Sequence, residues 1–231
     1  SSCMDERHTW NYHPQGWPYG YSKYLAELEV QKAVARGLDV VTVNPSVVFG
    51  AGDIYRQNNS IVMQVARERV PFLPEGGLNA VHIADVVEGH LKALERGQKG
   101  ERYILGGENL AHVDLIRRIA RLTGVTAPRV ILPGSVARAA ALPLRWFGSF
   151  LDFPVGSEEV AMAGWYFYYD MRKAQHQLGL STPRSVDEAL AETSDNLNKI
   201  KEKYGARAVG FGAGMPKGLE HFVLIRLANI F

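Results

Sequence analysis

Cysteine is nearly absent from this chain, and long apolar runs are absent altogether. Cys3 is the single cysteine among 231 residues. One thiol cannot form an internal disulfide, and it suits a reducing compartment, so we expect a cytoplasmic protein. No uninterrupted apolar stretch reaches the roughly 18 residues that a bilayer-spanning helix needs. No membrane span is therefore predicted.

The spacings of common metal-ligand motifs are also missing. The seven histidines include no H-x-x-x-H pair, and a single cysteine cannot make C-x-x-C. We predict no metal site. His82 is expected to be a hydrogen-bonded structural residue, and Asp53 and Asp85 are expected to be cap or turn residues.

Neither sign of charge dominates. The 26 Lys and Arg against 24 Asp and Glu give a formal net charge of +2, and the basic residues are dispersed. This balance predicts no nucleic-acid partner. With 46% hydrophobic and 22% charged residues, the composition is that of a globular chain able to bury one core.

The sequence has no G-x-G-x-x-G, the turn that cradles the pyrophosphate of a dinucleotide. Its densest glycine stretch is residues 210–214, but Met215 stands where the third glycine of that pattern belongs. No βαβ pattern surrounds this stretch. We interpret it as a loop.

What the sequence does have is alternation of helical and strand patterns. Residues 21–36 predict a helix that ends at Gly37, with an apolar face made of Leu25, Leu28, Val30 and Ala33. Residues 38–43 form a β-branched apolar run typical of a buried parallel strand, which Asn44-Pro45 ends. Further helices are predicted at 60–68, 84–96 and 113–122, and further strands at 102–105 and 129–132. Such alternation indicates an α/β domain with a mainly parallel sheet.

Particular residues indicate where these helices begin and end and which of their faces point inward. Ser60 fits an N-cap. Residues 84–96 present Val87, Leu91 and Leu94 on one face, while Ile116, Ile119 and Ala120 should point inward in the helix that Gly124 ends.

The pattern changes from about Pro128. Residues 136–151 are mostly apolar and are broken by Pro143, which favours packing between two helices over direct contact with a substrate. Residues 165–169 are strand-like. Residues 219–231 are interpreted as a short amphipathic helix that docks on the core, forms an oligomer interface or lies on a membrane surface.

Tyr19 and Lys23 stand four residues apart at the start of the first helix, so they lie on one face about one turn apart. An ammonium near a phenol favours the phenolate and lowers the phenol pKa. The pair can therefore move a proton on or off a hydroxyl or carbonyl oxygen. Taken alone, Y-x-x-x-K is a weak pattern.

Four ordered segments make it more specific. Residues 1–2 with 17–27, residues 41–53, residues 79–87 and residues 100–107 resemble, in this order, motifs of the extended short-chain dehydrogenases/reductases. That family includes NAD-dependent sugar epimerases and dehydratases, dihydroflavonol-reductase-like enzymes and 3β-hydroxysteroid dehydrogenases. The resemblance extends over residues 1–204, where residues 170–190 are similar to its closing segment.

The resemblance implies roles for individual residues. Tyr19 would be the general acid/base, Lys23 would lower the pKa of the phenol and bind the nicotinamide ribose, and Ser2 would polarise the same substrate oxygen. Asn44 would face the substrate. The loop formed by Pro45, Ser46 and Val48 would lie against the nicotinamide of NAD or NADP, with Ser60 as a weaker cofactor contact.

The implied fold is the C-terminal part of a Rossmann-like, doubly wound parallel sheet with a small, mainly helical substrate-capping region. We expect residues 1–127 to belong to the dinucleotide-binding domain, 128–204 to the capping region and closing helix, and 205–231 to a tail of unknown role. Because the glycine-rich turn is missing, the chain is interpreted as the C-terminal two-thirds of a longer enzyme. Alone, it should expose an edge of the strand at 38–43, aggregate and fail to bind NAD(P).

The predicted activity is hydride transfer at a hydroxyl or carbonyl group of a small molecule. The substrate would be a sugar nucleotide or a steroid-like or flavonoid-like compound, and a homodimer is possible. Only 16 residues, 3–18, separate Ser2 from Tyr19, which favours a reductase over a nucleotide-sugar epimerase or dehydratase. A dinucleotide-binding sensor or scaffold and an inactive fragment remain as alternatives outside enzymes.

Overall fold

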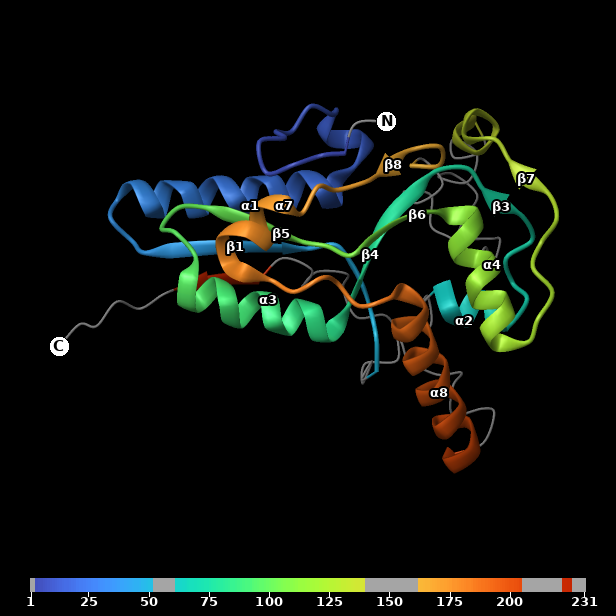
Figure 1. Cartoon of the computed structure of the whole chain (residues 1–231). Helices are drawn as coiled ribbons and strands as arrows, with labels where there is room; N and C mark the ends of the chain where they lie inside the picture. Colours follow the sequence, from blue (N-terminus) through green and yellow to red (C-terminus); the bar gives the residue numbers. More distant parts are fainter. Residues whose placement is uncertain (1–2, 52–60, 140–161, 205–221, 226–231) are drawn as a thin grey trace.

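The computed structural model describes residues 3–51, 61–139, 162–204 and 222–225 (Figure 1). Its first half is a layered α/β unit. Helix α1 (Pro18–Ala35) lies on one side of strands β1 (Val40–Pro45) and β5 (Arg102–Leu105), and helix α3 (Ile83–Arg96) lies on the other. The predicted helices at 21–36 and 84–96 and the predicted strand at 102–105 are thus present, as is the α/β fold with parallel strands.

Burial on both faces explains why β1 is an uninterrupted apolar run. Val40, Val41, Thr42 and Val43 are all buried. β1 pairs in parallel with β5, with Val43 opposite Tyr103. Helix α3 approaches this pair closely because Gly89 has no side chain: a Cβ there would lie 2.6 Å from a methyl carbon of Leu105. The prediction of a buried parallel strand is confirmed.

A second sheet is built around β4 (Gly77–His82). It pairs in parallel with β2 (Val47–Phe49) and β8 (Tyr166–Phe167), and antiparallel with β6 (Glu108–Ala111). The short strands β3 (Leu73–Pro74) and β7 (Ile131–Leu132) form a separate parallel pair. The predicted strands at 129–132 and 165–169 therefore exist only in part.

Three helices pack beside the second sheet: α2 (Ile61–Ala66), α4 (His112–Thr123) and α8 (Val186–Tyr204). α4 buries Leu115, Ile116, Ile119 and Ala120 against this cluster and ends at Gly124, whose φ of +70° is left-handed. The predicted inward face and end of this helix are confirmed. The described chain also contains three short helical segments: η1 (Pro14–Gly16), α7 (Arg172–Ala174) and the π-helical turn η2 (Gln175–Gly179).

The predicted apolar faces of α1 and α3 are wrong. Leu25 and Leu28 on α1 are 43% and 38% exposed, and α1 buries only Gly20. On α3, Val87, Leu91 and Leu94 are exposed, whereas Val86, Gly89 and Ala93 are buried. Small residues let α3 approach the sheet closely, so its inner face is not its most hydrophobic one.

The interpretation of residues 219–231 as a helix is also wrong for residues 222–225, the part of this range that the structure describes. Phe222–Ile225 form strand β9, which pairs antiparallel with β1, with Val40 opposite Ile225. This pairing covers the edge of β1 that the sequence was expected to leave exposed. The domain boundary after residue 127 stays a prediction. In the described parts of the chain, no helix combines the length and the apolarity needed to cross a bilayer.

Candidate functional site

The start of α1 brings Tyr19 and Lys23 together. Lys23 Nζ lies 5.4 Å from the centroid of the Tyr19 ring, and both side chains are half-buried. Pro18 occupies the first turn, where its missing N–H is not needed. Gly20 is buried beneath the Trp17 indole, since a Cβ would lie 2.4 Å from that ring. The predicted side-by-side placement of the phenol and the ammonium is confirmed.

The segment after β1 is less loop-like than predicted. Pro45 is the last residue of β1, and Val47 and Val48 already belong to β2, where they are 43% and 37% exposed. Ser46 connects the two strands. Its backbone N–H donates to Leu105 O at 3.0 Å, and its hydroxyl donates to Asn79 Oδ1 at 2.7 Å. The turn at Ser46 is therefore fixed from two sides.

Sequence reasoning missed the residue that fixes Ser46. Asn79 is fully buried in β4. Its Oδ1 also accepts from Gly107 N at 2.9 Å, and its Nδ2 donates to Asn109 Oδ1 at 2.7 Å. Asn109 in turn exchanges hydrogen bonds with the backbone of Tyr169. The available signal was a polar amide inside an otherwise apolar strand, beside Ala80 and Val81.

Asn44 is held by α1. Its Nδ2 donates to Glu27 Oε1 at 2.7 Å, and Arg102 donates to Glu27 Oε2 at 2.7 Å. Asn44 Oδ1 is buried and has no hydrogen-bond partner among the described residues. The predicted contact of Asn44 with the substrate stays a prediction.

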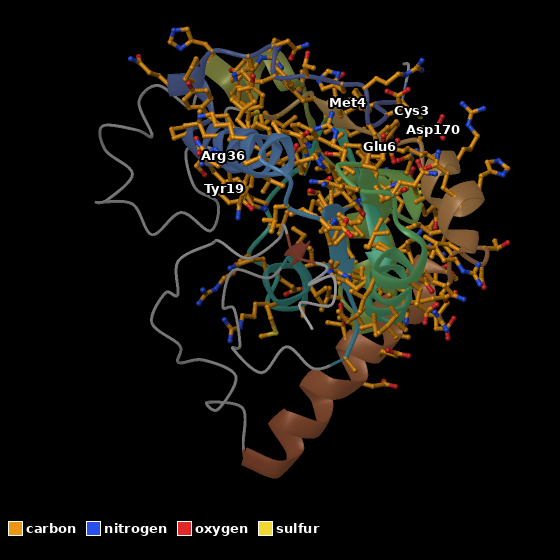
Figure 2. All side chains as sticks on the ribbon, turned by 90° about the vertical axis from the view of Figure 1, so that its left-hand side faces the viewer. Cys3, Met4, Glu6, Tyr19, Arg36 and Asp170 are labelled. Carbon is orange, nitrogen blue, oxygen red and sulfur yellow. The ribbon has the colours of Figure 1, made fainter. Side chains whose placement is uncertain are left out.

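The structure does not assemble the whole predicted set. Ser2 and Ser60 lie outside the described residues, as do Asp53 and the glycine stretch at 210–214. Cys3, the neighbour of Ser2, lies with Met4, Glu6 and Asp170 and away from Tyr19 (Figure 2). Its sulfur contacts Asn109 Nδ2 at 3.7 Å.

His82 is a helix cap. It is buried, and its Nδ1 accepts from Ala84 N at 3.0 Å at the start of α3. Nε2 must then carry the proton, and it faces Glu192 at 3.4 Å. Glu188 is the third member of a group whose ligand atoms lie within 4.8 Å of one another. A protonated Nε2 cannot ligate a cation, so the tautomer favours a structural role for His82.

Asp85 also has a structural contact. It accepts from the backbone N–H of Arg184 at 2.8 Å and forms an ion pair with the guanidinium of the same residue. It joins the first turn of α3 to the segment before α8.

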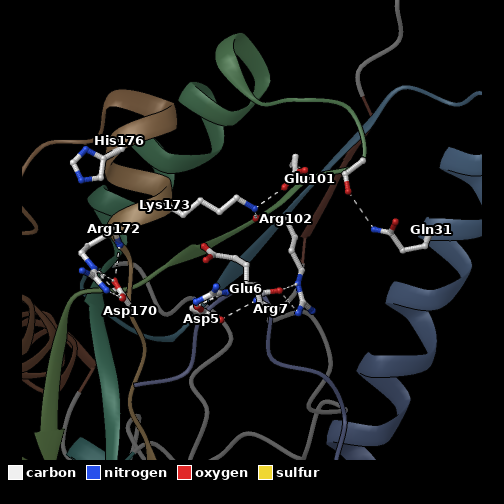
Figure 3. Close-up of a pocket in the computed structure, with 11 residues that line it drawn as sticks. Asp5, Glu6, Arg7, Gln31, Glu101, Arg102, Asp170, Arg172, Lys173 and His176 are labelled. Atoms are coloured by element: carbon white, nitrogen blue, oxygen red, sulfur yellow. Dashed lines mark hydrogen bonds and ion pairs between the residues drawn. The ribbon is translucent and has the colours of Figure 1, made fainter. Parts of the chain in front are cut away.

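A hollow of about 660 Å³ lies between the N-terminal segment, β5 and α7 (Figure 3). Its cations already have partners. Arg7 pairs with Asp5, Arg172 with Asp170, and Lys173 with Glu101. These contacts hold the carboxyl pKa values of Asp5 and Asp170 below their usual range, chiefly through the arginine hydrogen bonds. The paired charges leave no excess of either sign, and no predicted site residue lines the hollow.

Aromatic rings surround the N-terminal end of α1. Trp17 lies 6.0 Å from Trp10, 6.3 Å from Tyr19 and 5.5 Å from Phe167, measured between ring centroids. Phe167 lies 6.3 Å from Trp165, which is 36% exposed. We call Trp10, Trp17, Tyr19, Trp165 and Phe167 the aromatic surface. It places flat apolar groups next to the Tyr19 phenol.

The match to a family model covers the part of the chain that holds these residues. Residues 4–106, which hold Tyr19, Lys23, Asn44, Ser46 and Asn79, match the model of the NAD dependent epimerase/dehydratase family. Over these residues the chain is similar to the NAD-dependent epimerase/dehydratase family. The family resemblance seen in the sequence motifs is thus confirmed.

Relatives in this family include reductases and epimerases. The chain is 35% identical over 187 residues to a putative dihydroflavonol 4-reductase of Synechocystis, a match that covers 75% of this chain and 52% of that protein. It is 31% identical to sterol demethylase protein B of Methylococcus capsulatus, covering 55% of this chain and 39% of that protein. A solved nucleoside-diphosphate-sugar epimerase from Pseudomonas aeruginosa is 30% identical with a TM-score of 0.72, covering 86% of this chain and 61% of that one. The chain spans about half the length of the curated relatives it matches.

Proposed function

We propose that this chain carries the proton-transfer part of an NAD(P)-dependent reductase that acts on a carbonyl or hydroxyl group of a small molecule. The observation that carries the proposal is the Lys23 ammonium 5.4 Å from the centroid of the Tyr19 ring. Two such groups on one helical face are an acid–base pair suited to an oxygen atom.

In reduction, the Tyr19 phenol donates its proton to the carbonyl oxygen as that oxygen gains negative charge. Lys23 stabilises the phenolate that remains, because opposite charges at this separation attract. Ser2 donates a hydrogen bond to the same oxygen and polarises the carbonyl. In the reverse direction, the Tyr19 phenolate takes the proton from the substrate hydroxyl.

The donors and acceptors present fit the nicotinamide end of NAD or NADP. Lys23 offers N–H donors to the ribose hydroxyls. The buried Oδ1 of Asn44, without a partner among the described residues, is assigned to the substrate and not to the dinucleotide. Pro45, Ser46 and Val48 would line the nicotinamide, and Ser60 would add a contact. When bound, the dinucleotide supplies or accepts the hydride.

The aromatic surface favours a planar apolar substrate. Stacking on Trp or Tyr rings stabilises flat apolar rings. We therefore assign a steroid-like or flavonoid-like ketone as the first candidate substrate. The similarity to a putative dihydroflavonol 4-reductase supports the same choice.

A nucleotide-sugar epimerase or dehydratase is the second candidate, supported by the similarity to the Pseudomonas aeruginosa epimerase. Both candidates use the same Tyr19–Lys23 pair and differ in the substrate. A cytoplasmic location and a homodimer stay predictions.

The test is the Tyr19→Phe variant of the full-length protein, assayed for NAD(P)H oxidation with planar aromatic ketones and for product formation with sugar nucleotides, because epimerisation or dehydration consumes no net NAD(P)H. Turnover of the ketone should fall at least about a hundredfold, the usual contribution of general acid–base catalysis, while cofactor affinity changes little. Tyr24→Phe, on the same helix and stacked on Trp10, is the matched control and should keep turnover. Near-parental activity of Tyr19→Phe would refute the assignment, and turnover restricted to sugar nucleotides would favour the second candidate.

A further inference from the structure

Glu27 lies one turn beyond Lys23 and two turns beyond Tyr19, on the same face of α1. Its carboxylate points to the sheet, not to water, since the side chain is only 21% exposed. One oxygen accepts from Asn44 Nδ2 and the other accepts from Arg102, each at 2.7 Å. The helix of the proton-transfer pair is thereby tied to the end of β1.

Arg102 extends this connection to the N-terminal segment. From β5, its guanidinium donates to Glu27 and also to the backbone carbonyls of Glu6 and His8. The Glu6 carboxylate accepts from the backbone N–H of Ile104 at 2.9 Å. Figure 3 shows Arg102 and Glu6 side by side in this region. The Glu27–Arg102 ion pair therefore connects three parts of the chain that hold predicted site residues: helix α1, the end of β1 and the N-terminal segment.

Charge and donor count determine the orientation of Asn44. A carboxylate only accepts hydrogen bonds, so Asn44 must turn its NH2 group to Glu27. This leaves Asn44 Oδ1 on the other side, where it has no partner among the described residues. Glu27 therefore decides which end of the Asn44 amide points away from the helix.

We propose that Glu27 is a positioning residue: its carboxylate fixes the Tyr19–Lys23 helix against the segment Asn44–Val48 and orients the Asn44 amide. This inference rests on the proposed function, because the residues that Glu27 positions are those of the proposed site. Hydrogen bonds to a charged acceptor are about twice as strong as neutral ones, so a half-buried carboxylate suits this task better than an amide does.

The chain permits a test in which the carboxylate is moved, not removed. Asn44→Asp places a second carboxylate against Glu27, which removes the donor and introduces repulsion. Adding Glu27→Gln restores the pair: the new amide donates to the carboxylate at position 44, and its oxygen still accepts from Arg102. The double variant keeps the net charge and hydrogen-bond count of the parent.

Hydrogen exchange of this chain, followed by mass spectrometry, measures the coupling locally. In Asn44→Asp, peptides covering 19–27 and 44–49 should exchange about tenfold faster, in line with the loss of a hydrogen bond to a charged group. The double variant should return both peptides to the parental rate. Glu29→Gln is the matched control, because Glu29 lies on the same helix, is 71% exposed and pairs with Lys32; combined with Asn44→Asp, it should give no recovery.

Unchanged exchange in Asn44→Asp, or recovery with Glu29→Gln as good as with Glu27→Gln, would overturn the proposal. Turnover of the full-length protein provides the second measurement. Glu27→Gln alone offers Asn44 an NH2 group in place of a carboxylate oxygen, so the Asn44 amide should flip and turnover should fall about tenfold, whereas Glu29→Gln should leave turnover unchanged. Equal turnover in these two variants would refute the positioning role. The exchange measurement needs no turnover, so it decides the coupling even if Tyr19→Phe refutes the proposed function.

Discussion

Asn79 offers the sharpest test of how the site is held together. The side chain is fully buried and forms hydrogen bonds with three neighbours. Its Oδ1 accepts from the Ser46 hydroxyl and the Gly107 N–H, and its Nδ2 donates to Asn109. Asn79→Ala leaves two donors and one acceptor in the interior without these partners, and it also opens a small cavity.

The expected loss follows from those three groups. Each buried polar group left without a partner costs about 1–3 kcal/mol, and groups in one network do not add fully, so we expect a total of about 3–5 kcal/mol. For a chain of this size, that corresponds to a fall in Tm of about 10 °C. Ser46→Ala removes a single hydroxyl and leaves the Gly107 bond in place, so it should lose only about 1 kcal/mol.

Urea unfolding followed by tryptophan fluorescence gives both free energies of unfolding on this chain. The difference between the two free energies of unfolding matters more than either value, because errors of extrapolation largely cancel in it. If Asn79→Ala is no less stable than Ser46→Ala, the Asn79 network does not hold the turn at Ser46.

Three further predictions concern other parts of the fold. Gly20→Ala forces a methyl group to 2.4 Å from the Trp17 ring, so it should destabilise the chain by about 1–3 kcal/mol and alter tryptophan fluorescence; an unchanged spectrum and stability would contradict this. Burial lowers the pKa of His112, against a weaker opposing effect of the hydrogen bond that its ring donates to the Glu75 backbone. Below about pH 6.5 the unfolded chain then binds a proton that the folded chain does not, so the free energy of unfolding should fall as pH drops, and His112→Gln should flatten this dependence in urea titrations at several pH values. Removing residues 205–231 uncovers the edge of β1 that β9 pairs with, so amides 40–43 should exchange faster and light scattering should rise; equal exchange with and without these residues would refute that pairing.

Local patterns predicted the elements whose signals lie within one short segment. The strand at 102–105 and the helix ended by Gly124 follow from apolar spacing and a left-handed glycine, which require no knowledge of the partner. The side-by-side placement of Tyr19 and Lys23 follows from helical periodicity alone. The structure contains these features because each depends only on residues that are close together in the sequence.

Predictions that depended on a distant partner were less successful. Periodicity identified apolar faces on α1 and α3, but the sheet contacts the small residues Gly89 and Ala93 instead of Leu91 and Leu94. Residues 222–225 form a strand and not a helix because the edge of β1 offers them backbone hydrogen bonds, a partner about 180 residues away in sequence.

The sequence by itself determined the α/β class, the family resemblance and the face shared by Tyr19 and Lys23, because motif order and helical spacing are properties of the chain. Only the tertiary structure decided that Asn79 holds Ser46 and that Glu27 joins Asn44 to Arg102. Those contacts unite residues from separate strands and helices. Their geometry follows from how the elements pack, and a buried polar group finds its partner only once that packing exists.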